Sequence, residues 1–323
     1  MSTELSVITQ KDLIKGVSWL PETTTAGTIE TSGTMNWFGP IVRFSPTHGR
    51  SKLESPGAGL EDLRSISYPG GKIGSTTIAF KVINTGMIYY LTRRNEGAGT
   101  TSYPISLAAE INVHGTTKYW LAEFARPGFG LLSSGRDQEI IALGTFAHKY
   151  DRPLNASWTS KPTMATDPGE TSYPVWKFSD GGTNPVLWDS DGLDCEAIRI
   201  MVDKQPLIRT SAGGDTLRIN KCNARRIRWR MTVGNDSYAQ NLIDDHANGN
   251  VKDIVWTLQK AYGSGTANTK VVELTLTDCG VDPIPEEFLT AEENSEVLLN
   301  LSGTAKNLNW SPYATLSSSF SIS

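Results

Sequence analysis

The chain has 323 residues, and its 30 Lys and Arg against 34 Asp and Glu give a net charge of -4. Hydrophobic residues make up 38% of it, which is enough for a packed core and excludes a wholly disordered, collagen-like or coiled-coil protein. The near balance of charge argues against a dedicated nucleic-acid binder. The length fits two domains or one large β domain, and 30 Gly with 16 Pro predict short strands and many turns.

In the first half, a long polar stretch from Pro46 to Gly71 interrupts a β run and is expected to be a loop. The alternation of Ile78, Phe80 and Val82 then predicts a strand. The segment GMIYYLTRRN that follows is compatible with a short helix.

A hairpin is predicted next. Every odd position of residues 105–113 is apolar, which indicates a half-buried strand with one polar face. His114 and Gly115 supply a tight turn, residues 118–126 read as the partner strand, and Pro127-Gly128 is expected to end it. Residues 139–150 predict one more strand.

The second half repeats this order. It offers an alternating segment around Trp229, a short helix from Asp236 to His246 with Asp236 as its N-cap, and then three more alternating segments. Because the offset between the halves stays near ~150 residues, we predict an internal duplication. The predicted domains are 1–152 and 175–323, joined by an extended Pro-rich linker at 153–174. The alternative is two unrelated β runs with similar spacing.

No motif for chemistry stands out. The three Cys form no CxxC pair, the four His have no metal spacing, and no nucleophile elbow or phosphate-binding loop occurs. We therefore predict no enzyme and no cofactor, although sequence alone leaves a Ser/His/Asp triad open. Asp189, Asp191 and Asp194 form a weak calcium candidate, but the twelfth position of that loop is Ile200 rather than Glu, which favours a solvated acidic turn.

Charge is segregated in the second half. Residues 204–230 hold eight basic residues and one acidic residue, whereas residues 278–296 hold seven acidic residues and no basic one. Arg226, Arg228 and Arg230 share one strand face, and Trp229 points to the other face. This favours self-association, or pairing within the fold, over polynucleotide binding. The candidate assembly residues are Arg50, Lys52, Arg64, Arg226, Arg228, Arg230, Glu286, Glu287, Glu292 and Glu293.

The nine Trp raise a carbohydrate-binding alternative, because indole rings stack on sugars. Against it, four of them lie inside apolar alternation and are expected in the core, and three lie in or near the linker. The first group is Trp37, Trp120, Trp229 and Trp256; the second is Trp158, Trp176 and Trp188. The sequence offers no secretory signal and no long apolar run, so we expect a soluble chain made in a cytoplasm and no membrane partner.

The order of elements from Thr77 to Arg94 and onward resembles the major tail tube protein of long-tailed bacteriophages. The second copy carries the resemblance best, in DIVWTLQKAYGSGTANTKVVELTLTDCG followed by an acidic loop and EVLLNLSGTAKN. The resemblance implies a mainly β protein with two tandem β-sandwich or barrel-like tube domains, each with a short α-helix.

The same resemblance implies a structural virion protein, assembled in the host cytoplasm and located in the tail. Its rings, trimeric but pseudo-hexameric, would stack into a hollow tube through which double-stranded DNA passes without specific binding. Implied partners are further copies of the chain and the tape measure, tail tip and tail terminator proteins.

Residues 46–71, the linker and 282–295 are hypothesised to make contacts between chains or rings, with acidic 278–296 meeting basic 204–230. Alternatives are a carbohydrate-binding or adhesive β protein, a β-rich hydrolase, and the tube of a bacterial contractile injection or secretion system.

Overall fold

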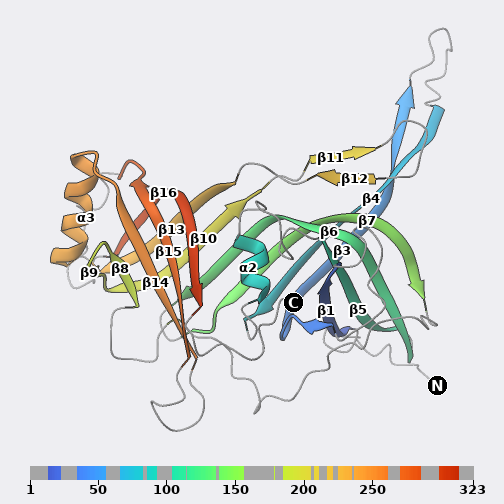
Figure 1. The fold of residues 1–323 in the computed structure, drawn as a ribbon, viewed down its shortest axis with the longest axis horizontal. Coiled ribbons are helices and arrows are strands. Elements are labelled where there is room, and N and C mark those ends of the chain that lie inside the picture. Colours follow the sequence, from blue (N-terminus) through green and yellow to red (C-terminus); the bar gives the residue numbers. More distant parts are fainter. Residues whose placement is uncertain are drawn as a thin grey trace, which may run out of the picture.

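A computed structural model describes the strands, helices and adjoining turns of the chain. The described residues are 14–22, 35–55, 66–82, 86–92, 104–113, 115–135, 138–155, 178, 185–204, 207–210, 217–220, 225–234, 236–260, 270–284 and 298–312. This part is mainly β, as the sequence predicts, with one large antiparallel sheet and two short helices (Figure 1).

The first half of the chain contributes seven strands and one helix to the described structure. They are β1 (Ile14–Pro21), β2 (Asn36–Trp37), β3 (Ile41–Ser55), β4 (Ile66–Lys81), α2 (Gly86–Thr92), β5 (Ile105–Val113), β6 (Thr116–Gly135) and β7 (Ile141–Asn155).

The second half contributes the remaining elements. They are β8 (Val186–Trp188), β9 (Asp191–Gly192), β10 (Cys195–Asp203), β11 (Leu207–Thr210), β12 (Leu217–Asn220), β13 (Arg226–Gly234), α3 (Ser237–Ala247), β14 (Lys252–Lys260), β15 (Lys270–Val281) and β16 (Leu298–Pro312).

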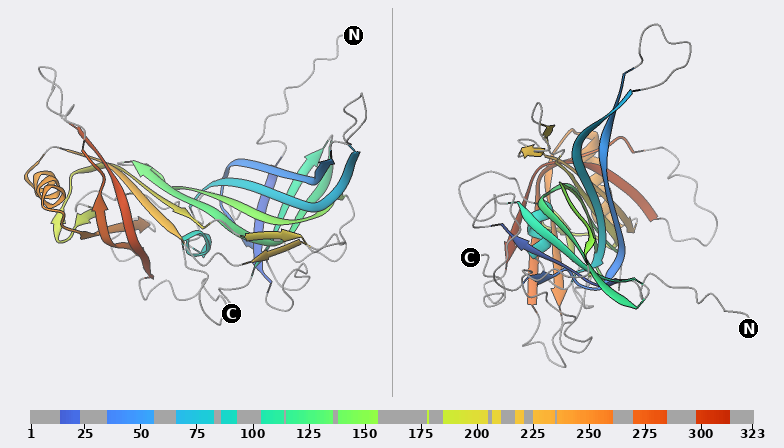
Figure 2. Two further views of the ribbon diagram at one scale, coloured as in Figure 1. Left: turned by 90° about the horizontal axis from the view of Figure 1, so that it is seen from above. Right: turned by 90° about the vertical axis from the view of Figure 1, so that its right-hand side faces the viewer.

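The two halves pair their strands in the same order. The first half reads β2-β1-β5-β6-β7-β4-β3, and the second reads β9-β8-β14-β15-β16-β13-β10. Helix α2 lies between β4 and β5 in the chain, and α3 lies between β13 and β14. All described pairings are antiparallel, and the 14-stranded sheet runs through both halves of an elongated molecule (Figure 2).

The repetition extends to backbone details. Phe124 in β6 and Asp278 in β15 both have left-handed φ values, of 55° and 50°. The two residues lie close to the point where β6 leaves β5, at the pair Ala125–Ile105, and where β15 leaves β14, at the pair Cys279–Lys252. Because left-handed backbone is unfavourable for residues other than Gly, its recurrence here marks the same local bend in both halves.

Both helices form where the sequence predicts them. In α3 the side chain of Asp236 caps the N-terminus by accepting from the backbone N–H of Ala239 at 2.8 Å. Ala239 and Leu242 form its buried side. Helix α2 is shorter and apolar, and the described residues of its chain segment are buried against the sheet.

One hydrophobic core cluster runs through both halves and combines aliphatic with aromatic side chains. A smaller cluster of Met35, Ala108 and Leu121 covers the opposite side of β5. The prediction of one polar face for residues 105–113 is therefore wrong: Ser106 and Ala108 are almost completely buried, because β5 is covered on both sides.

Two further predictions need correction. Pro127-Gly128 does not end its strand, because β6 absorbs the Pro at a register shift between Pro127 and Phe129 and continues to Gly135. The predicted loop at 46–71 is strand at both ends, since β3 reaches Ser55 and β4 begins at Ile66. Backbone pairing suffices for a hairpin without apolar alternation, so the hydrophobic pattern does not reveal it.

Candidate assembly surface

The surface of interest is the place where the two halves join. The second part of β6, from Phe129 to Gly135, pairs antiparallel with β10 from Asp203 to Ala197. This ladder, called the seam below, has no register shift, and it turns two similar strand layers into one sheet. The same edge of β6 pairs with two strands. It pairs with β5 up to Ala125, and with β10 after the bend.

Two cations of the second half fasten the seam to α2. The ammonium of Lys204, which is 2% exposed, donates to the backbone carbonyl of Tyr90 at 2.6 Å. Arg225 donates to the carbonyl of Thr92, and also to the side-chain oxygen of Asn307. The last carbonyls of a helix lack intrahelical partners, so cations at this end satisfy both hydrogen bonding and the helix dipole.

Phe178 ties the halves together a second time. Its backbone N–H donates to the carbonyl of Gln138 in the first half at 3.2 Å. Its ring packs on Trp256 of the second half, with 6.0 Å between ring centroids.

The exposed face of the sheet at the seam mixes polar side chains with half-buried apolar ones such as Met201 and Leu131, and it carries an arginine cluster. Arg226, Arg228 and Arg230 are exposed on one face of β13 while Trp229 is fully buried, as the sequence predicts. Arg199 of β10 lies directly opposite Arg230 in the ladder. Like charges placed opposite one another destabilise a sheet, so this arrangement favours a site that meets other molecules.

Sequence reasoning missed Arg199 because it lies on a different strand from the predicted arginines. A signal was present: Arg199 stands between Ile198 and Ile200, as Arg228 and Arg230 flank Trp229. Within the described residues, no ion pair is formed by Arg199, Arg228 or Arg230.

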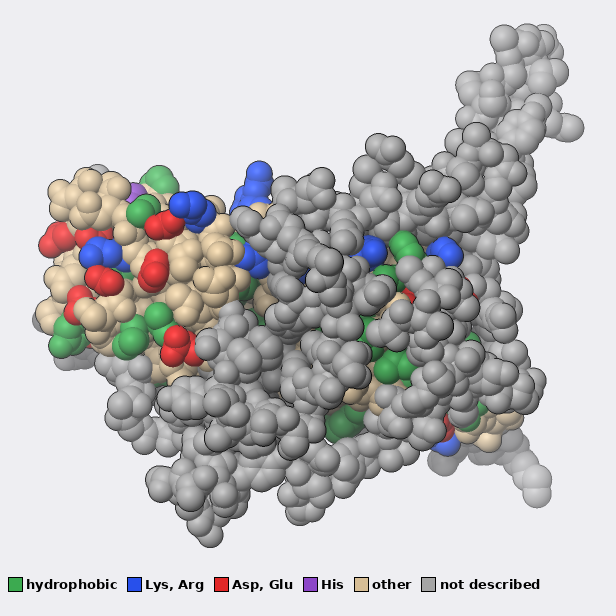
Figure 3. All heavy atoms as spheres, viewed as in Figure 1, with side chains coloured by type: hydrophobic (Ala, Val, Ile, Leu, Met, Phe, Trp, Pro, Cys, Tyr) green, Lys and Arg blue, Asp and Glu red, His purple; other side chains and the backbone are tan. Residues whose placement is uncertain are grey.

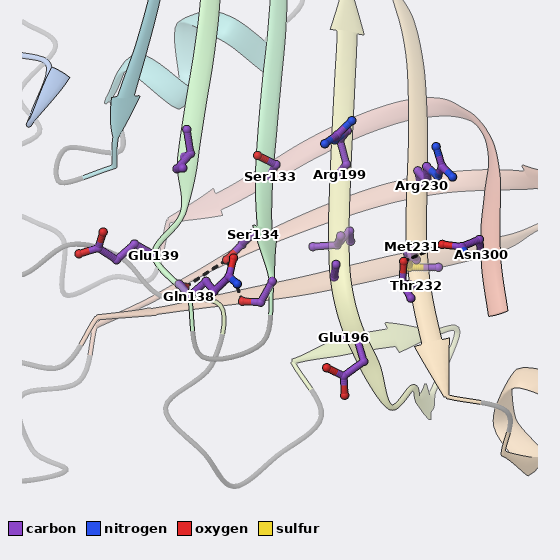
Figure 4. A pocket seen from close by; sticks show the side chains of 14 residues that line it. Ser133, Ser134, Gln138, Glu139, Glu196, Arg199, Arg230, Met231, Thr232 and Asn300 are labelled. Carbon is purple, nitrogen blue, oxygen red and sulfur yellow. Dashed lines mark hydrogen bonds between the residues drawn. The ribbon is translucent and has the colours of Figure 1, made fainter. Parts of the chain in front are cut away.

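A shallow pocket crosses the seam on this face (Figure 4). Arg199 and Arg230 extend from adjacent strands, and Glu196 lies towards the other end of the β10 strand. The rest of the lining mixes amide and hydroxyl side chains with apolar ones, and Thr232 donates to Asn300 at 2.9 Å. Among these lining residues, no Ser or Cys is paired with a base in the described structure.

At its described end, the predicted acidic segment contacts strand β16 rather than the predicted basic segment 204–230. Asp278 forms an ion pair with Lys306 at 2.9 Å, and Asp282 accepts from the Ser302 hydroxyl at 2.9 Å. Strand β16, which carries both partners, lies between β15 and β13. A shallow pocket there is lined by Asp282 together with Arg228 and Arg230.

The other predicted assembly residues lie, wholly or by their side chains, outside the described part of the chain. Backbone pairing puts Arg50 opposite Lys72 and Lys52 opposite Pro69 in the β3–β4 hairpin, but their side chains lie outside the described part. Outside the described residues altogether are Arg64, Glu286, Glu287, Glu292 and Glu293.

The three Asp residues of the calcium candidate each have a different neighbour. Asp189 pairs with Lys252 at 2.9 Å, Asp191 accepts from Asn241 at 3.0 Å, and Asp194 lies beside Gly234. In the described ranges, no group of three or more His, Cys, Asp or Glu side chains is arranged to hold a metal ion.

The tryptophans whose side chains are described serve the core. Trp120, Trp188, Trp229 and Trp256 are at most 1% exposed, and Trp37 is half-buried. Trp188, which the sequence placed near the linker, lies in β8 and donates its indole N–H to Asp245 at 3.0 Å. Buried rings cannot stack on a sugar, which weakens the carbohydrate alternative. Trp158 and Trp176 lie outside the described residues.

On the face seen in Figure 3, acidic and basic side chains intermingle around the end that carries α3, without one large field of a single sign. Comparison with known proteins finds no family model that matches the chain and no curated protein with a matching sequence. Neither α2 nor α3 is long and apolar enough to cross a membrane.

Proposed function

We propose that this protein is a structural subunit that assembles with copies of itself into rings stacked as a hollow tube, the tail tube of a long-tailed bacteriophage. The observation that carries the proposal is the repeated strand order of the two halves together with the seam that joins them. A chain that already joins two similar units edge to edge contains, within itself, the type of contact a ring requires.

The seam joins unlike edges, β6 of one unit and β10 of the next, so it is a head-to-tail contact. Head-to-tail contacts close into rings when the rotation between units allows it. With two units per chain, three chains supply the six units that the tail-tube resemblance implies.

The polar face of the sheet is the surface proposed to line the tube. It carries hydroxyl and amide groups, including the Thr77–Thr145 and Thr232–Asn300 contacts. Arg199, Arg228 and Arg230 make this face more basic than the composition suggests. Such a lining would hold passing DNA by its phosphates, in a salt-dependent way and without reading sequence.

In this proposal the chain resides in the virion tail and performs no catalysis. Its protein partners would be other copies of itself within the tube and the tape measure, tip and terminator proteins at its ends. A contractile injection or secretion tube would use the same kind of assembly.

Negative-stain microscopy of the purified protein over a wide concentration range tests this function. The expected result is rings or long hollow tubes, with a sedimentation profile that shifts from single chains to large assemblies as concentration rises. Single chains at every concentration and salt level, without or with preformed tail tips, would contradict the proposal.

A further inference from the structure

We infer that the outer edge of β3 pairs with the end of β15 from a second copy of the chain, in the register of the seam. This inference rests on the proposed function, because it names the contact through which one chain joins the next.

The outer edge of β3 is the counterpart of the β10 edge used in the seam. Both β3 and β10 pair with the strand that precedes a helix. Phe44 of β3 pairs with Ile78 of β4, and Ile200 of β10 pairs with Trp229 of β13. Strand β10 has a second neighbour, β6, whereas β3 pairs only with β4 among the described strands. The match also places Arg43, which is exposed, at the position of Arg199.

The end of β15 is likewise the counterpart of the β6 edge. Strand β14 pairs with β15 up to Cys279, and from there β15 continues against β16 alone, as far as Val281 opposite Gly303. In the first half, Gly130 lies opposite Gly144 at the equivalent place. The described outer edge of β15 beyond Cys279 therefore offers the stretch that β6 gives to β10.

This correspondence fixes a register. In the seam, Met201 lies opposite Leu131 and Asp203 lies opposite Phe129. Transferred to the contact between chains, Ser45 lies opposite Asp282, and the neighbouring pairs are Arg43 with Ile284 and Thr47 with Gly280.

Prolines set this contact apart from the seam. Lys204 donates its backbone N–H to Gly128 of β6, so Val202 and Ile200 also face β6, because strand N–H groups alternate in direction. The equivalent positions in β3 are Pro46 and Phe44, and Pro46 has no N–H to donate.

The outer edge of β15 also has a proline at a position that would donate to the other chain. Asp282 donates its N–H to Ser302 of β16, so Val281 and Pro283 face outward. Pro283 has no N–H, and the carbonyl of Val281 already accepts from His246 Nδ1 at 3.1 Å. The contact between chains thus keeps only the N–H donors of Phe44 and Val281 at these four positions.

Proline on an exposed edge strand prevents unwanted pairing. A ladder with half its donors is weak for a single pair of chains and becomes sufficient when ring closure makes several contacts at once. The prolines therefore reduce unwanted edge pairing of the free chain and still allow the ring to close.

The hairpin of β11 and β12 supports the same arrangement. It connects β10 to β13, as the outer parts of β3 and β4 connect in the first half, and β12 contacts β4 and β7 across the seam. The β3–β4 hairpin projects from the far end of the sheet, away from the second half (Figure 1). In the proposed contact it reaches β13 and β16 of the next chain.

Cysteine cross-linking in the full-length chain tests the register. Ser45→Cys and Asp282→Cys would occupy a directly opposed, non-hydrogen-bonded pair, where Cα atoms about 4.5 Å apart permit a disulfide. Oxidation of the double variant should give covalent dimers and trimers on a denaturing gel, and a mixture of the two single variants should give dimers. The matched control is Ser45→Cys with Gly280→Cys, which is out of register by two residues and should give far less product.

Microscopy of the same samples separates the two proposals. Rings or tubes without the Ser45–Asp282 cross-link, or with equal cross-linking of the control, would overturn the contact and leave the proposed function standing. An absence of assemblies and cross-links would overturn both.

A second experiment tests the role of the prolines. Pro46→Ala and Pro283→Ala each restore one N–H donor, and each should lower the concentration needed for assembly by about fivefold. The control is Pro127→Ala, at the register shift within β6, which should leave that concentration unchanged. Unchanged or weakened assembly of properly folded Pro46→Ala and Pro283→Ala would count against the inference.

Discussion

In the first half Trp19 of β1 packs edge-on against Tyr90 of α2, with ring centroids 5.2 Å apart, whereas in the second half Trp188 of β8 donates its indole N–H to Asp245 of α3. The two Trp lie at matching places, since each pairs with the same position of the next strand, at Leu107 or Ile254. The strand order and the left-handed bends are shared, while the side-chain chemistry around them differs. The two halves thus share their backbone pairing while the side chains around it differ.

The largest expected difference between the halves concerns the carboxylates that cap the left-handed bends. Glu22 is fully buried and accepts from the Phe124 N–H at 2.6 Å and the Ser106 hydroxyl at 3.0 Å. Asp253 accepts from the Asp278 N–H at 2.9 Å in an exposed setting. Glu22→Ala should lower the free energy of unfolding by about 3–5 kcal/mol, because it leaves buried groups unpaired, and Asp253→Ala by about 1 kcal/mol.

Arg126 provides a reason for this asymmetry. Burial lowers the pKa of its guanidinium, and the nearby Glu22 carboxylate opposes that shift. Removing Glu22 would leave this cation less compensated. Urea denaturation of both variants measures the comparison, and equal losses would show that the two carboxylates are interchangeable in energy.

The next difference concerns two glycines at matching places in β7 and β16. A methyl group at Gly303 would lie 1.9 Å from the backbone oxygen of Gly280, whereas one at Gly144 would meet side-chain atoms of Leu91 and Phe146 at 2.7 Å. Side chains can move aside more easily than a paired strand. Gly303→Ala should therefore destabilise by about 3 kcal/mol and Gly144→Ala by about 1–2 kcal/mol. Thermal unfolding monitored by circular dichroism would reveal the order, and the reverse order would contradict it.

A smaller loss is expected when the link between the halves is cut. Lys204→Met leaves the Tyr90 carbonyl without this cation and should lower the free energy of unfolding by about 2 kcal/mol. Hydrogen exchange should quicken first in α2, which belongs to the other half. Lys252→Met serves as the control: it removes an exposed ion pair with Asp189 and should change nothing measurable. Loss of protection confined to β10 would contradict the link.

The smallest effect per residue depends on pH and belongs to the second half alone. Burial raises the pKa of Cys195 and of Cys279 to about 12, from a usual value of 9.0. The folded chain therefore retains thiol protons that the unfolded chain releases. This contribution to stability is complete below pH 9 and is lost as the pH rises towards 12.

At pH 10 the loss should be about 1–2 kcal/mol for each thiol. Comparing wild type with Cys195→Ala/Cys279→Ala isolates this term from other titrations, because the double variant should lose less stability between pH 8 and pH 10. Equal slopes for the two proteins would contradict it.

The sequence predicts individual strands and helices well where the hydrophobic period or a helix-capping residue marks them. The alternation around Trp229 and the Asp236 cap identify β13 and α3, because both signals are local. The repeated order is visible for the same reason. Where a second layer intervenes, the pattern misleads: Ser106 and Ala108 read as a polar face, yet long-range packing buries them.

Only part of the candidate surface can be predicted from the sequence. Arg226, Arg228 and Arg230 follow from strand alternation, but the seam itself pairs residues far apart in the chain, and nothing local marks it. Arg199 joins the cluster only through that pairing. Pro46 and Pro283 are predicted as loop residues. The structure pairs Pro46 of β3 with Thr76 of β4, and the Asp282 N–H bond to Ser302 directs the backbone nitrogen of Pro283 away from β16.

The cations that end α2 also set an order of events during synthesis. Lys204 and Arg225 follow the helix carbonyls they contact by 114 and 133 residues, so α2 emerges from the ribosome long before either cation exists. Closing so long a loop is slow, so during synthesis the last carbonyls of α2 lack these two cations. A chain cut short before Lys204 therefore lacks both cations that bind the end of α2.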